Sequence, residues 1–424
     1  MRGQRFWHRA EFGRLLARAG EIFRRSGSHL DRGSTPPPHV LRQRAGERSR
    51  ATSPSAASVA PSGSGVANAN HHLADLEYAL GTTEVESFPH QLHIATAERC
   101  NMRCIMCRVS ADPYEFESHL ADRVHGEIDA LLPLVDTVHV NGAEPFQHFA
   151  AGRLHHMLEA VDERDLPSFV TTTNGLLLTE DIAQVVLDRF ARIRISVDSP
   201  DPAVYESIRV RSSFERVRRN IEYLRDLKEQ HGRGRRDAPT MHINYLVMDR
   251  TYRDVADFID LAHEWGVCEV RFSPVRINFD ESLRGEDIFS DVDKVREFCD
   301  VMERARTKAD EHGMEIIDRT SRLVRQALDV AQPVDRPQRR GRRPQGHAGK
   351  PVCPAPWSSL WIARDGEARF CLQGVSIGNV NETPVAEVIN TEAAQRIRRE
   401  FVVGDYSSCK RGQCPRGIKN VGAH

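Results

Sequence analysis

The chain has 424 residues, 40% of them hydrophobic, and a formal net charge of -1. This length exceeds one compact domain of ordinary size, so we expect one large domain, a smaller one and an extension. The near-zero charge gives no overall electrostatic case for a nucleic acid or an anionic membrane as partner. No apolar stretch has the length needed to cross a bilayer.

Cysteine usage points to metal chemistry. Nine cysteines occur in a long chain in which we recognise no secretory signal. In such a chain clustered cysteines bind metal or react, so we expect a reducing, cytoplasmic location and no disulfide framework. Seven of the nine fall into two groups, at positions 100, 104 and 107 and at positions 353, 371, 409 and 414.

The N-terminal 85 residues differ in composition from the rest. The first fifty hold twelve arginines and four acidic residues, a bias typical of a basic arm, a transit peptide or a disordered extension. Residues 31–70 are rich in Ser, Pro, Ala and Gly and cannot bury enough apolar surface to fold alone. We therefore expect a largely disordered extension over 1–85, with ordered structure starting near His71.

From 86 to 330, short β-rich runs alternate with helical stretches. The expected strands are 92–97, 137–142, 168–173, 192–197, 242–247 and 268–273. The expected helices are 115–134, 151–164, 179–190, 213–230 and 252–266, followed by a longer helical region at 291–330. Such repetition predicts a parallel sheet with right-handed crossovers. The predicted fold is α/β, a partial (β/α)6 TIM-like barrel whose site lies at the carboxyl ends of the strands.

The first cysteine group follows the first predicted strand. Cys100, Cys104 and Cys107 therefore lie in the loop above its carboxyl end, where a barrel places its active site. Three thiolates on one loop suit an iron–sulfur cube, and they leave one of its four iron corners open. A structural zinc site normally takes four ligands, so zinc fits this loop less well.

The CxxxCxxC spacing at this position resembles the radical S-adenosylmethionine (SAM) superfamily. Three later strand ends carry segments similar to the SAM-binding motifs of that family, although Ala143 stands where its GGEP motif has a second glycine. The resemblance implies a SAM-binding [4Fe-4S] cluster on the three cysteines. The residues that it implies for SAM contacts are Gly142, Ala143, Glu144, Pro145, Asn174, Ser196, Asp198 and Arg209.

The resemblance also implies the chemistry. Such a cluster, reduced by a flavodoxin- or ferredoxin-type electron donor, passes one electron to SAM. The products are methionine and a 5′-deoxyadenosyl radical that abstracts hydrogen from a substrate. The protein would then supply position and exclude water.

The second cysteine group lies beyond a basic, Pro/Gly-rich linker at 331–350. Residues 353–371 predict a hairpin with its turn at Asp365 and Gly366. Four cysteines can saturate one metal centre, and zinc is an alternative for such a set. The CX12GX4C hairpin, the GNV segment and the closing cysteine pair resemble the SPASM/twitch extension of radical SAM enzymes. They imply a module at 351–424 in which Cys353, Cys371, Cys409 and Cys414 hold an auxiliary [4Fe-4S] cluster.

With four thiolates no iron of that auxiliary cluster remains open, so we expect an electron relay of the shorter twitch type. The leading hypothesis is a radical SAM oxidoreductase, a dehydrogenase acting on a sugar or aminocyclitol in specialised metabolism such as antibiotic biosynthesis. The candidate bases are Tyr245, Arg271 and Arg276, near the ends of the fifth and sixth strands.

Two alternatives remain at this point. SPASM-type enzymes often modify a ribosomally made peptide, usually with an N-terminal peptide-recognition module that residues 1–85 do not resemble. A non-catalytic metal-binding or nucleic-acid-associated protein would use the Arg-rich arms at 1–50 and 338–343. Salt-sensitive binding of nucleic acid would favour that last reading.

Overall fold

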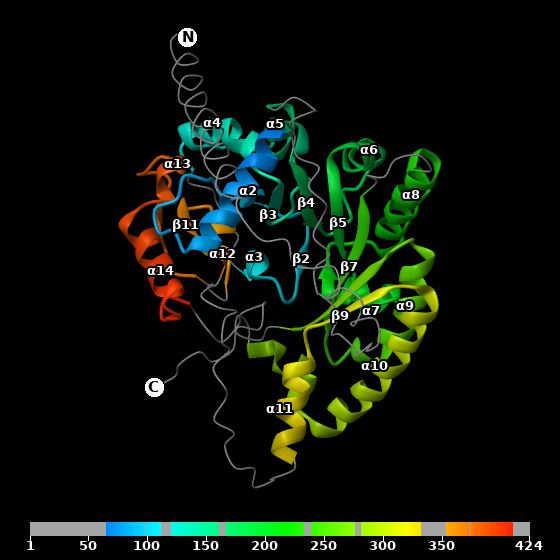
Figure 1. The fold of residues 1–424 in the computed structure, drawn as a ribbon. Helices are drawn as coiled ribbons and strands as arrows, with labels where there is room; N and C mark the ends of the chain where they lie inside the picture. The colour runs from blue at the N-terminus through cyan, green and yellow to red at the C-terminus, as the bar shows by residue number, and fades with distance from the viewer. Residues whose placement is uncertain are drawn as a thin grey trace, which may run out of the picture.

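A ten-stranded sheet organises the protein (Figure 1). The computed structural model describes residues 65–97, 99–111, 120–160, 167–232, 239–275, 281–331, 353–372 and 374–409. The strand order is β12-β11-β10-β1-β3-β4-β5-β7-β8-β9. All neighbouring pairs from β10 to β9 are parallel, whereas β10, β11 and β12 pair antiparallel.

The strands are short, as expected for barrel units. Those of the large sheet are β1 (Gln91–Ala97), β3 (Thr137–Gly142), β4 (Ser168–Thr173), β5 (Phe190–Ser196), β7 (Thr240–Val247), β8 (Glu269–Pro274), β9 (Glu315–Asp318), β10 (Ser359–Ile362), β11 (Glu367–Arg369) and β12 (Gly378–Asn379). A separate two-stranded sheet pairs β2 (Arg103–Cys104) with β6 (Arg209–Val210).

Helices alternate with the strands and cover the outer side of the sheet (Figure 1). The α-helices are α2 (Gly65–Leu80), α3 (Arg108–Ala111), α4 (Asp122–Leu131), α5 (Arg153–Glu159), α6 (Glu180–Arg189), α7 (Pro202–Ile208), α8 (Phe214–Gly232), α9 (Val255–Glu264), α10 (Val292–His312), α11 (Ser321–Ala331), α12 (Ala355–Ser358), α13 (Val385–Val388) and α14 (Glu392–Val402). Short 3-10 turns are η2 (Leu132–Leu134), η3 (Phe149–Ala151), η4 (Tyr252–Asp254), η6 (Glu281–Glu286) and η7 (Ile288–Ser290).

Local sequence explains where these helices begin and end. Asp291 caps α10 by accepting hydrogen bonds from the backbone N–H groups of Asp293 and Lys294. Gly313 ends the same helix in the left-handed region, at φ 66°, which glycine adopts without steric cost. On α6, Ile182 and Val186 are four residues apart and both buried, so the helix presents one apolar face to the sheet.

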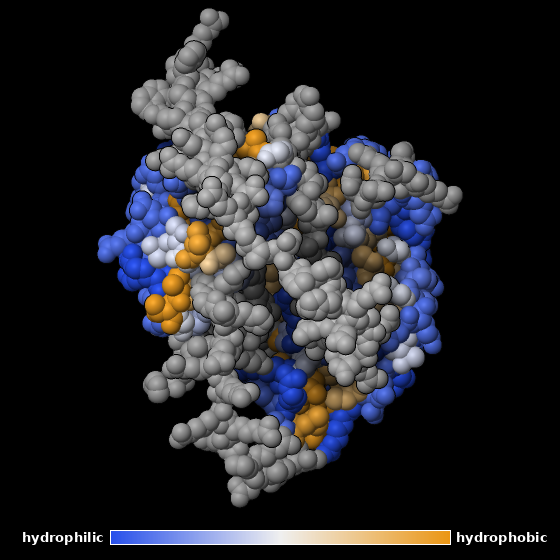
Figure 2. Space-filling view, in the orientation of Figure 1, coloured by the Kyte–Doolittle hydropathy of each residue, from blue (hydrophilic) through white to orange (hydrophobic). Residues whose placement is uncertain are grey.

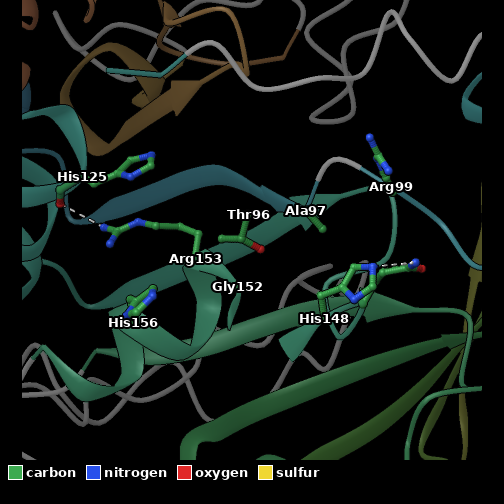
Figure 3. A pocket seen from close by; sticks show the side chains of 9 residues that line it. Thr96, Ala97, Arg99, His125, His148, Gly152, Arg153 and His156 are labelled. Carbon is green, nitrogen blue, oxygen red and sulfur yellow. Dashed lines mark hydrogen bonds between the residues drawn. The ribbon is translucent and has the colours of Figure 1, made fainter. Parts of the chain in front are cut away.

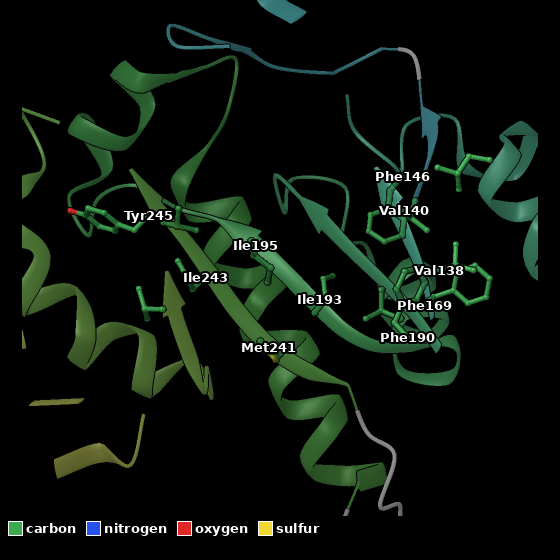
Figure 4. Packing of buried hydrophobic residues seen from close by; sticks show 14 of the residues in the cluster. Val138, Val140, Phe146, Phe169, Phe190, Ile193, Ile195, Met241, Ile243 and Tyr245 are labelled. Atoms are coloured by element: carbon green, nitrogen blue, oxygen red, sulfur yellow. The ribbon is translucent and has the colours of Figure 1, made fainter. Parts of the chain in front are cut away.

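The outer face of the sheet is the hydrophobic core (Figure 4). Alternate residues of each strand are fully buried there against the helices, for example Val138, Ile193, Ile195, Met241 and Ile243. Each such side chain contributes about 1.5–3 kcal/mol relative to an exposed one. The intervening residues therefore face the other way, toward the concave side of the sheet.

The predicted α/β fold class is confirmed, and the six expected strands are β1, β3, β4, β5, β7 and β8. Within the expected helical region 291–330, however, the four residues of β9 form a strand that pairs with β8. Glu315–Asp318 is too short to show a strand period, and it is fixed by its neighbour rather than by its own pattern.

The extension expected over 1–85 also needs correction, because its described part is folded. Helix α2 begins at Gly65, and Asn70 is buried with its side-chain amide donating to the carbonyls of Phe88 and Leu134. The backbone N–H of Phe88 donates to Asn70 Oδ1 in return. Helix α2 contacts η2 and α12, so its alanines belong to a packed helix rather than to a low-complexity segment.

The surface helices at the rim of Figure 2 are mostly hydrophilic. A few large apolar side chains remain exposed, among them Leu80 at the end of α2 and Val403 just after α14. In the described part of the chain, no helix combines the length and the apolar character needed to span a membrane.

Candidate iron–sulfur and SAM site

The first cysteine loop is folded against β6. Cys104 lies in β2, which pairs antiparallel with β6 so that Cys104 faces Arg209 in register. Met102 is 1% exposed and anchors the loop in the core. The N–H of Cys107 donates to the carbonyl of Cys104 at 3.1 Å, which turns the chain back on itself.

This turn gathers the three thiols. Burial raises the pKa of the Cys104 thiol to about 11; Arg209 opposes that shift, while Cys107 and Cys100 add to it. Burial likewise raises the pKa of Cys100, to which Cys107 also contributes. Three thiolates this close together repel one another, and a bound iron–sulfur cluster would remove that repulsion by binding each sulfur. This donor set therefore fits a cluster held by three cysteines.

The segment from Gly142 to Pro145 (GAEP) is hydrogen-bonded to the end of β1 and the start of the same loop. The N–H of Ala143 donates to the carbonyl of Ala97, and that of Glu144 to the carbonyl of Arg99, both at 3.2 Å. Gly142 has φ 130°, and a Cβ there would lie 2.5 Å from the Ala97 oxygen. Only glycine fits this close approach, whereas Ala143 causes no conflict despite its departure from the family motif.

Glu144 is the buried acid of the site. It is 1% exposed and accepts hydrogen bonds from the Thr173 hydroxyl at 2.7 Å and from the Asn174 N–H at 2.8 Å. Burial raises its pKa to about 7 although these bonds act to lower it. A buried carboxylate with a raised pKa would be stabilised in its charged form by a nearby cation. The amino group of SAM could supply that positive charge.

Asn174 joins the acid to the cysteine loop. Its side-chain amide donates to Asn101 Oδ1 at 2.8 Å and approaches Cys100 Sγ at 3.7 Å. Three consecutive strand ends are thereby connected: that of β1 through Asn101, that of β3 through Glu144 and that of β4 through Asn174. Asn101 and Thr173 were not predicted, although both lie inside the motifs that were identified.

A buried ion pair forms the far side of the site. Asp198 is fully buried after β5; its Oδ2 lies 2.8 Å from Nε of Arg209, and its Oδ1 accepts from the N–H of Leu246. Arg209 Nη1 also approaches Cys104 Sγ at 3.9 Å. Ser196 ends β5, half-buried, in register with Asn244. The predicted SAM contacts thus meet at the carboxyl ends of β1, β3, β4 and β5, around the cysteine loop.

The second cysteine group lies at the opposite end of the sheet. β11 runs antiparallel to β10, so Cys371, which follows β11, lies at the amino end of the parallel strands. Cys409 pairs with Gly374 in a β-bridge, and a Cβ on Gly374 would lie 3.6 Å from Cys371 Sγ. Cys353 precedes β10 at this same end, separated from it by α12. Cys414 lies outside the described residues.

The expected hairpin is present as β10 and β11, with Gly366 at φ 84° in its turn. Its pairing was not foreseen, because β10 aligns parallel with β1 in the register Leu92 with Leu360. The cysteine module therefore continues the sheet of the core. None of the cysteines among the described residues forms a disulfide.

Of the three candidate bases, Tyr245 is wrong. It is 0% exposed and lies with the buried residues of the outer face of the sheet (Figure 4). Its hydroxyl donates to the Thr251 carbonyl at 2.7 Å, and its ring packs edge-on against Phe258 and Phe272. Side chains of a strand alternate between its two faces, and Tyr245 points to the outer face, whereas its neighbours in β7 point to the concave side. Arg271 does face that side, and Arg276 lies outside the described residues.

A cavity of about 500 Å³ adjoins this site at the carboxyl end of β1, where Ala97 and Arg99 line it, and extends toward α4 and α5 (Figure 3). Arg153 and His156 of α5 and His125 of α4 line it, and Arg153 is paired with Asp129. The cavity includes neither cysteine group. We therefore assign the chemistry to the cysteine loop and the concave face rather than to this cavity.

Comparison with known families agrees with this geometry. The Radical SAM superfamily matches residues 94–262, and the iron–sulfur cluster-binding domain called SPASM matches residues 353–415. Together these regions contain both cysteine groups. The two domains imply bound [4Fe-4S] clusters and SAM.

Two relatives illustrate the similarity in sequence. A GTP 3′,8-cyclase from Synechocystis sp. is 25% identical over 207 residues, which cover 47% of this chain and 59% of the cyclase. The molybdenum cofactor biosynthesis protein moc-5 from Caenorhabditis elegans is 26% identical over 188 residues, covering 43% of this chain and 29% of moc-5. This chain thus spans less than two thirds of the length of either relative.

Solved structures show the same fold. SuiB from Streptococcus suis bound to its precursor peptide SuiA has a TM-score of 0.52 at 16% identity, covering 81% of this chain and 73% of SuiB. Hexahistidine-tagged anSMEcpe with bound AdoMet has a TM-score of 0.51 at 16% identity, covering 79% of this chain and 89% of its own. These structures agree with this chain in fold. Because the radical SAM and SPASM family models match residues 94–262 and 353–415, the chain belongs to the radical SAM superfamily, as a radical SAM enzyme with a C-terminal SPASM domain.

Proposed function

We propose that this enzyme is an oxidoreductase that oxidises a small polyhydroxylated substrate and passes the electron to an auxiliary [4Fe-4S] cluster. The observation that carries this proposal is the placement of the two cysteine groups at opposite ends of one parallel sheet. A substrate on the concave face lies between them. Hydrogen can then leave toward one end and an electron toward the other.

We assign the residues as follows. Cys100, Cys104 and Cys107 hold the SAM-binding cluster, and Glu144 and Asp198 position SAM, the first by its charge and the second through Arg209. Cys353, Cys371 and Cys409, with Cys414, hold the auxiliary cluster. When bound, these groups supply a 5′-deoxyadenosyl radical and an electron acceptor.

The remaining step belongs to the chain: accepting the hydroxyl proton. Arg271 is poorly suited to it, because its pKa, lowered chiefly by burial, is still about 10, so the guanidinium stays protonated at pH 7. His139 and His242 occupy concave-face positions of β3 and β7, and burial lowers the pKa of both imidazoles. With a pKa of about 4 the His139 imidazole is uncharged at pH 7. We propose that His139 or His242 accepts the proton.

We also propose the division of the chain. A core barrel covers 86–330, and the auxiliary module covers 351–424. Helix α2 belongs structurally with the core, because Asn70 bonds to the segments that precede β1 and β3. Trp357 and Arg398 of the module donate to the carbonyls of Thr82 and Thr83 just after α2.

The test uses purified, anaerobically reconstituted enzyme with SAM, a reductant and a panel of sugars and aminocyclitols. Release of 5′-deoxyadenosine together with a product two mass units lighter than the substrate supports the proposal. If 5′-deoxyadenosine accumulates with no panel member consumed, polyol oxidation fails. If instead a peptide encoded beside the gene becomes modified, the enzyme is a peptide maturase.

A further inference from the structure

A group of arginines lies on the concave face of the sheet. Arg192 and Arg194 are alternate residues of β5, and their neighbours Ile193 and Ile195 are buried in the outer core. Arg194 is in register with His242 of β7, which is in register with Glu269 of β8. Residues in register on adjacent strands point to the same face, so these side chains meet on the concave side.

The acid among them cannot satisfy this many donors. Glu269 Oε1 accepts from Arg194 Nη2 at 3.0 Å and from Arg271 Nη2 at 3.3 Å, and it lies 2.9 Å from Nδ1 of His242. A single carboxylate oxygen thus serves three partners. A guanidinium carries five N–H donors, so Glu269 alone cannot accept from all the donors of Arg194 and Arg271.

Several of the leftover donors are buried. The Nε atoms of Arg192, Arg194 and Arg271 are shielded from solvent and hydrogen-bond to no described residue. Arg194 as a whole is only 8% exposed. Burying a charged donor without a partner is costly, so a protein that keeps three together needs an acceptor for them.

The neighbouring imidazole of His139 carries no charge that could offset the positive charge of the arginines. Burial and the nearby Arg192 and Arg194 lower the pKa of His139 to about 4, so this imidazole is neutral at pH 7. Arg194 and Arg319 lower the pKa of Arg271 in the same way, after burial itself. Positive charge therefore exceeds negative charge at this part of the concave face.

The group lies between the two ends of the sheet. Arg192 is in the amino half of β5, four residues before Ser196 at the carboxyl end, a separation of about 13 Å along the strand. The cysteine loop lies at that carboxyl end, and the auxiliary cysteines lie at the amino end. A molecule anchored on the arginines would extend from the middle of the concave face toward Glu144 and Asp198.

We propose that the enzyme recognises a phosphorylated substrate, whose phosphate ester or diphosphate binds Arg192, Arg194 and Arg271. Planar guanidinium groups pair with phosphate oxygens through two parallel hydrogen bonds, and three such groups suit a multiply charged phosphate better than a single carboxylate. The inference rests on the proposed function, because it places a phosphate on the polyol or on a group attached to it. It requires no additional reactant.

Binding of inorganic pyrophosphate to the reconstituted holoenzyme tests the anion site. Titration calorimetry is done on the wild type and on Arg192→Gln, Arg271→Gln and Arg271→Lys. We expect each glutamine variant to weaken binding by about tenfold or more, and the lysine variant to lose less because it keeps the charge. Arg219→Gln is the matched control, since Arg219 is on α8 with its side chain 69% exposed, and it should bind as the wild type does.

Iron content and circular dichroism report whether each variant is folded, and Arg271→Lys separates a charge requirement from a packing defect. No pyrophosphate binding by the wild type, or equal affinity in the wild type and both glutamine variants, would overturn the anion site. Weakening by Arg219→Gln to the same degree would also overturn it, because the binding would then be non-specific.

Turnover assays separate this inference from the function on which it rests. We expect phosphorylated sugars to stimulate 5′-deoxyadenosine release more than the same sugars without phosphate, and Arg271→Gln to raise KM more than it lowers kcat. Stimulation by neutral polyols alone would overturn the phosphate site and leave polyol oxidation standing. Arginine-dependent pyrophosphate binding without turnover of any sugar would do the reverse.

Discussion

The two ends of the parallel sheet are built in different ways. At the carboxyl end, the site residues come from loops that directly follow their strands, and contiguous motifs carry them: Cys100 to Cys107, Gly142 to Pro145, and Asn174. Toward the amino end, the arginine group comes from the middle of β5 and β8, and the auxiliary cysteines come from the C-terminal segment that includes β10 and β11. The first arrangement holds a common cofactor, whereas the second is free to vary and is suited to recognising a particular substrate.

The largest expected effect lies at the carboxyl end. Cys104→Ala removes a buried ligand candidate next to Arg209, and we expect 5′-deoxyadenosine release to fall by about 1000-fold or more, since no other group supplies the electron. Chromatographic quantification of 5′-deoxyadenosine measures the loss. Cys299→Ala changes a half-buried thiol on α10 and serves as control. Unimpaired SAM cleavage by Cys104→Ala would show that the cysteine loop at the carboxyl end does not hold the cluster that cleaves SAM.

The matching change at the amino end is Cys371→Ala. We expect the variant to lose about four iron atoms per chain and to lose product, while SAM cleavage in the absence of substrate stays within about tenfold of wild type. Iron analysis and the ratio of product to 5′-deoxyadenosine measure these effects. A normal product ratio would show that the amino-end cysteines have no part in turnover, and the two ends would then not be coupled.

The third prediction concerns the buried ion pair. Asp198→Asn leaves Arg209 buried without its carboxylate, and we expect the free energy of unfolding to fall by about 3 kcal/mol. Urea unfolding under anaerobic conditions measures this change. Glu215→Gln is the control, because Glu215 pairs with Arg218 on the surface of α8 and its loss should not be measurable. Equal effects of the two variants would mean that the Asp198 pair is not a buried support of the SAM end.

The smallest expected effect is a pH dependence that arises from His139, on the concave face between the two ends. The pKa of His139 is about 4 in the folded protein, below its unfolded value of about 6.5, so the unfolded chain binds more protons in between. Stability should therefore fall by about 1 kcal/mol from pH 7.5 to pH 5.5 on account of this residue. In His139→Phe, the free energy of unfolding measured in urea should depend on pH less steeply by that amount. An unchanged slope would show that the imidazole is not held neutral.

The sequence allowed most of the fold and one end of the site to be predicted. Alternation of six apolar runs with helical stretches is a local signal, and so is a cysteine triplet after a strand. Tyr245 was misassigned because a strand end does not show which alternate residue faces inward. β9 was missed because Glu315–Asp318 forms a strand only beside β8.

The arginine group escaped prediction for a related reason. Arg192 lies on β5, whereas Glu269 and Arg271 both lie on β8, with β6, β7 and several helices between the two strands in the sequence. Each residue stands in an ordinary strand sequence. Their meeting depends on register, which the pairing of β5, β7 and β8 sets. A motif search has no access to register, since a shift of one residue would move every one of them to the outer face.

The parallel pairing of β10 with β1 has a consequence for how the protein can evolve and be engineered. Without the C-terminal hairpin, β1 would present a free edge of unpaired N–H and C=O groups, a template for aggregation. Three stacked aromatic rings connect β10, β1 and β3. The ring centroids of Trp361 and His93 are 3.8 Å apart, and those of His93 and His139 are 4.0 Å apart. The hairpin is thus a protective border as well as a carrier of cysteines, and a shortened catalytic core would need another strand in its place.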